Sequence, residues 1–191
     1  RFTFSFNAGQ VRDLPDNMSR NLASSASGAT VSGDGANLSA LIDDTEVTNW
    51  ASLTGPVLGK QVTVRLAPSQ ASHLVRRVQV SAMLRVNTND PNDPGGQNRF
   101  SALRQFEIWA CEAKGAVDCS QDAQYTLIFT SPDDAFPAGV PRPRAPELIM
   151  RSFDVPQTKA THVRLRVLTN QCTGGPAYQG DQDDDPINST D

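Results

Sequence analysis

The segment ALIDDTEVTNW, residues 40 to 50, places two adjacent carboxylates and several hydroxyl and amide groups between an apolar dipeptide and a tryptophan. Oxygen-rich loops of this kind serve two purposes. One is to hold calcium, which takes about six to eight oxygen ligands from carboxylates and backbone carbonyls. The other is to turn the chain, with an aspartate side chain accepting a hydrogen bond from the backbone two residues on. The residue types alone leave both open.

A second candidate for chemistry is the cysteine pair in WACEAKGAVDCS. Cys111 and Cys119 flank a seven-residue polar loop, a spacing that lets a disulfide close a β-hairpin. A disulfide would indicate an oxidising compartment, so we expect an extracellular, secreted protein. The other interpretation is two reduced cysteines. Cys172 is left over, which suggests a partner outside the given residues and a domain that continues past Asp191.

Catalytic groups are few. His73 and His162 each stand at the edge of an alternating segment, which is typical of ordinary surface residues. The sequence contains no Gly-x-Ser-x-Gly, His-Glu-x-x-His or phosphate-binding glycine loop. A glycosidase could use two carboxylates a suitable distance apart, and Asp133 and Asp134 are one such candidate pair, but solvated loop acids are far commoner. We therefore predict that the chain is not an enzyme.

Composition and charge limit the classes of partner that the chain is expected to bind. The 191 residues suffice for one hydrophobic core. The net charge is −4, but five aspartates lie in the last eleven residues, and without them 17 basic residues face 16 acidic ones. A nearly neutral body has no electrostatic surface for nucleic acid or an anionic membrane. No apolar run approaches the roughly 20 residues that span a bilayer, so no transmembrane segment is expected.

Strict alternation of apolar and polar residues predicts an all-β protein of half-buried antiparallel strands. The expected inward faces include Ala82 and Leu84 in the second alternating segment and Leu127 in the fourth. About eight strands with long loops indicate a jelly-roll β-sandwich spanning residues 21–191, preceded by a leading strand or linker at 1–20. The alternating segments are residues 62–66, 78–86, 103–111, 125–129 and 162–167, with shorter ones at 1–6 and 29–31.

Two long proline-rich segments, residues 87–98 and 131–146, are predicted loops because proline is confined to the edges of sheets. Loops of this length often carry function. Sugar recognition combines an aromatic face with side chains that form paired hydrogen bonds. A second interpretation has Phe136 capping the core and the arginines solvated. The predicted ligand-binding residues are Asn87, Asn89, Asp90, Asn98, Arg99, Phe136, Arg142 and Arg144.

The order of segments resembles the discoidin or coagulation factor type C domains, a galactose-binding-like family of jelly rolls. The likeness covers roughly residues 20 to 170, and its best anchors are the spacing from Asp43 to Trp50 and the late strand ATHVRLRV. The closing segment is similar to modules of secreted bacterial hydrolases. The other segments that carry the likeness are NLASSASGATVSG, VTVRL, VRRVQVSAM and FEIWAC.

The resemblance implies a five-stranded sheet facing a three-stranded one, ligand binding at the loop tips of one end, and a structural calcium in the first loop. By position, the calcium ligands would be Leu41, Asp43, Thr45 and Thr48. Asp44 stands where the family prefers glycine, and it would either supply a missing carboxylate or leave the site degenerate. The family's glutamate from the last strand is not visible here. Trp50 is expected to pack beneath the loop.

The family's members usually bind rather than catalyse, as carbohydrate-binding modules, lectins or cell-adhesion modules. The leading hypothesis is a non-catalytic extracellular module that binds a carbohydrate or cell surface and is appended to a larger secreted protein. Its effect would be to raise the local concentration of a linked partner. The alternative is a structural or protein-interaction domain that packs against a neighbouring domain or subunit.

Overall fold

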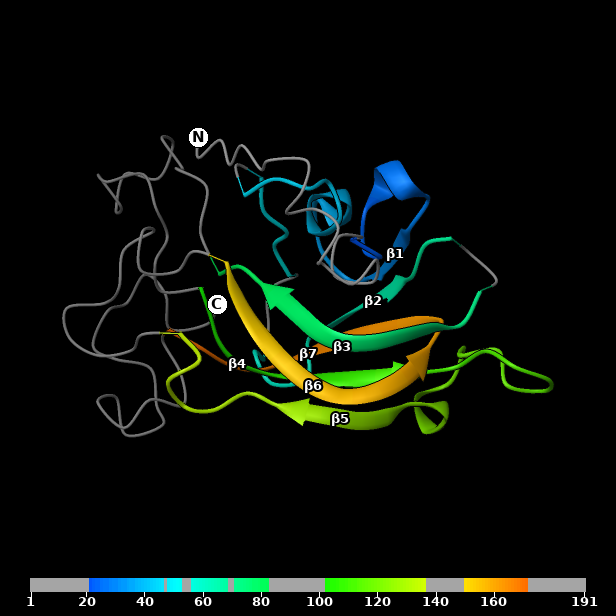
Figure 1. Ribbon diagram of the computed structural model, residues 1–191. Helices are drawn as coiled ribbons and strands as arrows, with labels where there is room; N and C mark the ends of the chain where they lie inside the picture. Colours follow the sequence, from blue (N-terminus) through cyan, green and yellow to red (C-terminus); the bar gives the residue numbers. More distant parts are fainter. Residues whose placement is uncertain are drawn as a thin grey trace, which may run out of the picture.

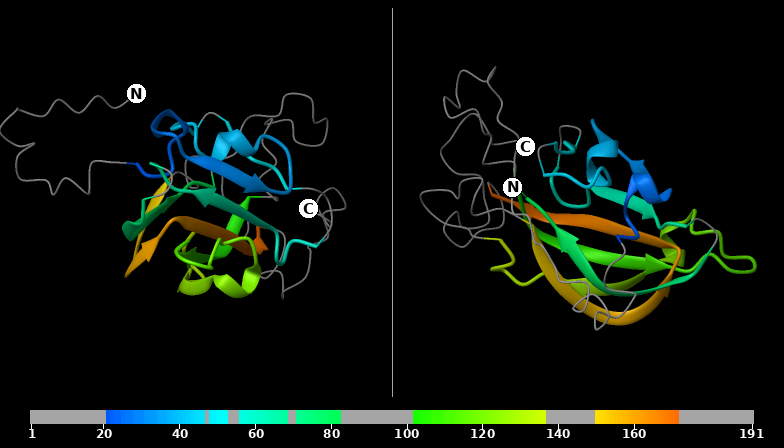
Figure 2. Two further views of the ribbon diagram at one scale, coloured as in Figure 1. Left: turned by 90° about the vertical axis from the view of Figure 1, so that its right-hand side faces the viewer. Right: turned by 45° about the horizontal axis from the view of Figure 1, so that its top comes forward.

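The computed structural model describes residues 21–46, 48–52, 56–68, 71–82, 102–136 and 150–171. In this part of the chain, seven strands form two antiparallel sheets that lie face to face (Figures 1 and 2). The larger sheet has the order β1-β2-β7-β4-β5, and the smaller one pairs β3 with β6. The strands are β1 (Thr30–Gly33), β2 (Gln61–Arg65), β3 (His73–Val80), β4 (Leu103–Cys111), β5 (Thr126–Thr130), β6 (Arg151–Ala160) and β7 (His162–Asn170).

The predicted antiparallel β-sandwich is confirmed, with seven strands in the described residues against the expected eight or so. The five-stranded sheet that the resemblance implies is present, whereas the facing sheet has two described strands in place of three. Three short 3₁₀ helices accompany the strands: η2 (Ser25–Ser27), η3 (Leu38–Leu41) and η4 (Asp122–Gln124). None of the helices described is long and apolar enough to cross a membrane.

The core follows the alternation of β4. Phe106, Ile108 and Ala110 are buried as predicted, while the residues between them are only half-buried. Phe106 is fully enclosed and meets Phe153 of the opposite sheet edge-on, with ring centroids 5.2 Å apart. Phe129 of β5 lies 5.6 Å from the same Phe153 ring. Aromatic pairs at such distances add to the free energy of burial, so this cluster holds the two layers together.

A bulge in β5 changes the predicted inward face. Ile108 pairs with Phe129 and Trp109 pairs with Leu127, which leaves Ile128 as an extra residue. Ile128 and Phe129 therefore both pack on the core. Leu127 was predicted to face inward but is 41% exposed, because a one-residue slip moves every side chain beyond it to the other face.

The smaller sheet departs further from the prediction. β3 begins at His73, five residues before the predicted segment, and Ala82 lies beyond its end but is buried; Leu84 is outside the described residues. β6 was not predicted at all. It contains Pro156, which falls in the irregular stretch of pairing between Asp154 and Thr158. A bulge tolerates proline because no ladder hydrogen bond is required there.

The predicted disulfide is confirmed. Cys111 and Cys119 are joined with an S–S distance of 1.99 Å. Inside this loop, Lys114 and Val117 exchange backbone hydrogen bonds of 2.9 and 3.1 Å, so the segment is itself a tight hairpin. The Tyr125 hydroxyl donates to the Cys119 carbonyl at 3.0 Å. The hairpin is thus fixed to the end of β4 and the start of β5.

We predict that Phe106→Ala lowers the free energy of unfolding by about 3 to 5 kcal/mol, because it removes the ring that bridges the sheets and leaves a cavity. Leu127→Ala, on the neighbouring strand but on the exposed face, is the matched control and should cost less than about 1 kcal/mol. Urea denaturation measures both. Equal losses in the two variants would contradict this description of the core.

Candidate functional site

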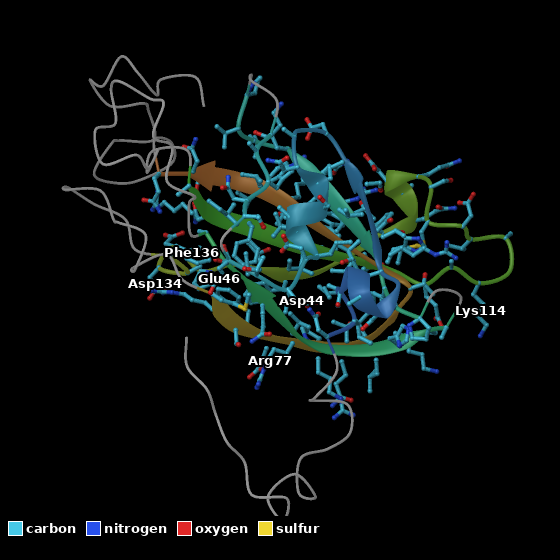
Figure 3. The ribbon with its side chains drawn as sticks, turned by 90° about the horizontal axis from the view of Figure 1, so that it is seen from above. Asp44, Glu46, Arg77, Lys114, Asp134 and Phe136 are labelled. Carbon is cyan, nitrogen blue, oxygen red and sulfur yellow. A yellow bond between two sulfur atoms is a disulfide. The ribbon has the colours of Figure 1, made fainter. Side chains whose placement is uncertain are left out.

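Five strands share one end of the sandwich, which we call the loop end: β3, β5 and β7 end there, and β4 and β6 begin there. Figure 3 shows Phe136, Asp134 and Glu46 toward this end and Lys114 at the opposite one. Of the predicted ligand-binding residues, Phe136 belongs to the described part of the chain. The other seven, Asn87, Asn89, Asp90, Asn98, Arg99, Arg142 and Arg144, lie outside it.

Phe136 is a core residue. It is fully buried, with its ring centroid 6.4 Å from that of Phe106 and 6.3 Å from that of Phe153. The guanidinium carbon of Arg151 lies 5.6 Å from its centroid. A sugar stacks on an exposed aromatic face, and Phe136 has none to offer. Its prediction as a ligand contact is therefore corrected to a cap on the core.

Polar contacts hold the loop end in place. The Glu46 carboxylate accepts hydrogen bonds from the Ser81 hydroxyl and, at 2.8 Å, from the Met150 backbone N–H. Arg151, the first residue of β6, donates to the Ala135 carbonyl at 2.9 Å. These contacts tie the segment after η3 to the end of β3, the start of β6 and the segment after β5. The loop end is thus a braced platform.

Arg104 is the residue at this end that the sequence analysis missed. It is 2% exposed, on the face of β4 that also carries Phe106. Leu103 pairs with Asn170 and Gln105 with Thr169, so Arg104 is the extra residue of a bulge. Among the described residues, no acceptor lies within hydrogen-bond distance of its Nε or Nη1. The signal was present in the sequence, as a charge two residues before Phe106 on the apolar side of the alternation.

The predicted calcium loop is only partly assembled. Asp43 accepts hydrogen bonds from the Thr45 N–H at 3.2 Å and from the Thr48 hydroxyl at 2.5 Å. Asp44 has a positive φ of 62°. Its carboxylate accepts hydrogen bonds from Asn21 Nδ2 at 2.7 Å and from the Ser24 hydroxyl. Leu41 ends η3 and is 36% exposed.

The donors around the two aspartates fit an Asx turn. The Thr45 N–H bond to Asp43 is the bond that defines such a turn. The Asp44 carboxylate accepts hydrogen bonds from Asn21 and Ser24. In the part of the chain that the structure describes, no three His, Cys, Asp or Glu side chains gather in a metal-binding arrangement. These contacts fit a turn better than a calcium site, and melts in calcium and in chelator decide between the two. Trp50 is half-buried beside the loop, its indole N–H donating to the Asp34 carbonyl at 2.8 Å.

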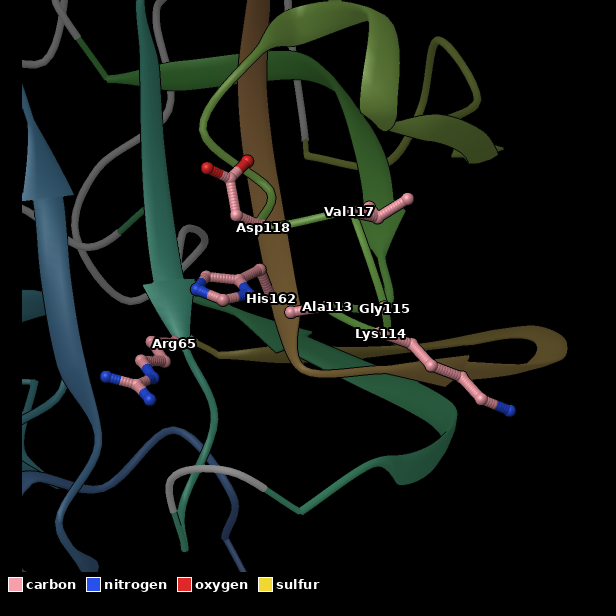
Figure 4. Close-up of a pocket in the computed structure, with 7 residues that line it drawn as sticks. All are labelled: Arg65, Ala113, Lys114, Gly115, Val117, Asp118 and His162. Carbon is pink, nitrogen blue, oxygen red and sulfur yellow. The ribbon is translucent and has the colours of Figure 1, made fainter.

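The opposite end carries an open hollow of about 460 Å³, the hairpin pocket, shown in Figure 4. Thr161 organises it: its hydroxyl oxygen accepts from the Ala113 N–H at 2.8 Å and lies 2.8 Å from His162 Nδ1. Burial lowers the pKa of His162, and the neighbouring Arg65 lowers it further. The pocket is lined by Arg65, Ala113, Lys114, Gly115, Val117, Asp118 and His162.

The polar side chains of the hairpin pocket do not all point toward one position where a ligand could sit. Figure 4 shows the Lys114 side chain extending away from His162 and Asp118. Hydrogen bonds from the Ser120 hydroxyl and N–H lower the pKa of Asp118, which keeps it an acceptor at neutral pH. A ligand here would meet exposed groups on an open surface. The pocket is therefore the second candidate, after the loop end.

No family model and no curated protein match the chain. It is similar to several solved structures. One is CpGH89CBM32-5 from Clostridium perfringens, in complex with GalNAc-β-1,3-galactose (15% identity, TM-score 0.44, 74% of this chain and 84% of that chain). Another is chitosan-binding module 1 of a chitosanase/glucanase from Paenibacillus sp. IK-5 (19%, 0.49, 82% and 90%). A third is the family 32 carbohydrate-binding module of Streptococcus pneumoniae EndoD (16%, 0.45, 82% and 90%).

These proteins are of the class that the sequence resemblance implies. Identities below 20% and TM-scores below 0.5 say nothing about individual ligand contacts, so the site is argued from this chain's own residues.

The Asx turn generates a prediction about metal. Asp44→Ala should lower the free energy of unfolding by about 1 to 2 kcal/mol, because the Asn21 and Ser24 donors lose their acceptor. The loss should be the same in calcium and in chelator, as measured by thermal melts. A wild-type melting temperature that rises in calcium, with the rise abolished by Asp43→Ala, would instead establish a bound ion.

His162 generates a prediction about pH. Its folded-state pKa lies below the usual 6.5, so the unfolded chain binds the proton more tightly and folding loses stability as pH falls through that value. The drop in unfolding free energy between about pH 7.5 and about pH 5.5 should shrink in His162→Gln. Arg65→Gln should shrink it less, because burial is the larger cause. An unchanged pH dependence in His162→Gln would refute the assignment.

Proposed function

We propose that the chain is a non-catalytic carbohydrate-binding module of an extracellular protein, and that it binds its glycan at the loop end. The observation that carries the proposal is the braced platform itself. Glu46 holds Ser81 and Met150, which lie beside the two predicted ligand loops, and Arg151 holds the Ala135 carbonyl within the second of them. Glycan binding requires a few hydrogen-bonding groups held in fixed geometry, and the contacts of Glu46 and Arg151 support such a geometry at this end.

The disulfide supports the extracellular part of the proposal, since a Cys111–Cys119 bond persists in oxidising compartments. As part of a larger secreted protein, the module would act by linkage. Holding a partner domain near its substrate raises the local concentration without any new chemistry in the module. The acid pair Asp133 and Asp134 fits this role, because Asp133 accepts a hydrogen bond from Gln105 Nε2 and Asp134 is exposed. We assign no catalytic function to either.

Two arguments favour the loop end over the hairpin pocket. The loop end contains a buried cation, Arg104, whose hydrogen bonds are worth more in a low-dielectric site than on an open surface. The hairpin pocket is an open hollow in which Lys114 extends away from His162. Hydrogen bonds to sugar hydroxyls there would compete with water at every contact.

Binding to immobilised glycans tests this proposal. The wild type should bind at least one glycan class. Glu46→Ala, which removes the carboxylate that accepts from Ser81 and Met150, should weaken that binding about tenfold or more while the chain stays folded. Lys114→Ala at the opposite end is the matched control and should change affinity by less than about twofold.

Two results would count against the proposal. An array without signal for any glycan would remove the function. Loss of binding in Lys114→Ala, with Glu46→Ala unaffected, would move the site to the hairpin pocket.

A further inference from the structure

We propose that the ligand is an acidic glycan and that Arg104 binds its carboxylate. This inference rests on the proposed function, and it adds the chemical class of the ligand and the residue that selects it. The evidence is the position, burial and charge of one side chain.

Arg104 is the second residue of β4, so it is buried on the inward face of the strand near the loop end. The next inward residue along the strand is Phe106, fully buried in the aromatic cluster. The bulge leaves Arg104 without a partner on β7 in the pairing register. Bulges of this kind re-aim a side chain and are over-represented next to active sites. Local backbone structure thus places a cation at the loop end of the core.

None of the acidic side chains described around this end forms an ion pair with Arg104. Glu46 accepts from Ser81 and Met150, and Asp133 accepts from Gln105. Asp134 is exposed. Glu107 lies on the outward face of β4 and accepts from the Trp109 indole at 2.9 Å. Within the described residues, Arg104 therefore has no salt bridge and no acceptor for its Nε or Nη1.

A guanidinium stays ionised in proteins, and a buried charge without a counter-ion costs several kcal/mol. A carboxylate delivered by a ligand removes that cost, because it supplies the missing negative charge and acceptor oxygens for a planar donor group. A neutral sugar hydroxyl supplies an acceptor but no charge. The same physics therefore gives both affinity for an acidic sugar and discrimination against its neutral analogue.

Matched ligands provide the first test and need no variant. Trigalacturonate and trimannuronate are titrated into the wild-type protein by calorimetry, alongside their methyl esters, which keep the shape and lose the charge. At least one free acid should bind about tenfold or more tightly than its ester, and galactose 6-sulfate should bind more weakly than the acid. Equal binding of acid and ester, or preference for the sulfate, would overturn the inference while leaving the proposed function in place. Binding of no glycan at all would remove the proposed function.

Substitution at the buried site provides the second test. Without ligand, Arg104→Met should raise the melting temperature by about 3 °C or more, because a buried unpaired charge is replaced by an apolar side chain of similar length. The same variant should lose the preference for acid over ester. Arg77→Met is the control, since Arg77 is exposed and pairs with Asp154 at 2.8 Å, and it should change neither quantity. A lower melting temperature in Arg104→Met would show that the guanidinium already has a partner within the protein and would overturn the inference.

Discussion

One row of side chains along β4 governs the stability of this protein and reaches the end where we propose that it binds its ligand. Inward-facing residues of a central strand must fill the space between two sheets, and β4 does so with Phe106, Ile108 and Ala110. Phe106 meets Phe153 across the layers, so the smaller sheet is held by the same row. At the loop end the row continues with Arg104. The row of inward-facing residues on β4 therefore has a cation at its loop end and apolar side chains along the rest.

The two ends of the sandwich are built differently from this common core. At the hairpin end, the disulfide closes the 111–119 segment on itself, and the Thr161 hydroxyl, just before β7, accepts a hydrogen bond from its Ala113 N–H. At the loop end, Glu46 and Arg151 brace strands of the smaller sheet against the segments beside them. The hairpin end is therefore stabilised covalently, whereas the loop end combines a rigid frame with a buried charge. Proteins commonly accept such a local loss of stability where function requires it.

Much of the larger sheet could be predicted, because its strands obey a period of two. The alternation of β2, β4 and β7 and the spacing of Cys111 and Cys119 gave correct faces and a correct disulfide. The smaller sheet could not be predicted in the same way. β6 carries Pro156 within an irregular pairing with β3, and this removes the pattern on which the prediction depends.

The candidate site was harder to predict than the smaller sheet, because bulges leave no sequence signature of their own. The bulge in β5 exposes Leu127, and the bulge in β4 isolates Arg104 from its partner strand. For Phe136 the sequence left two interpretations open, a ligand contact or a cap on the core, and its ring in the aromatic cluster decides for the cap. Burial decides such cases, and burial depends on contacts between residues far apart in the chain. A charge on the apolar side of an alternating strand is the local signal that deserved more weight.

The most direct test of the account is a nuclear magnetic resonance titration that follows the Arg104 side-chain Nε–H signal and the backbone amides as an acidic trisaccharide is added. The account predicts that the Arg104 signal shifts together with the amides of Ser81, Ala102 and Met150, while those of Lys114 and His162 stay in place. Shifts confined to the hairpin pocket, or an Arg104 signal that does not respond to a ligand that binds, would contradict it.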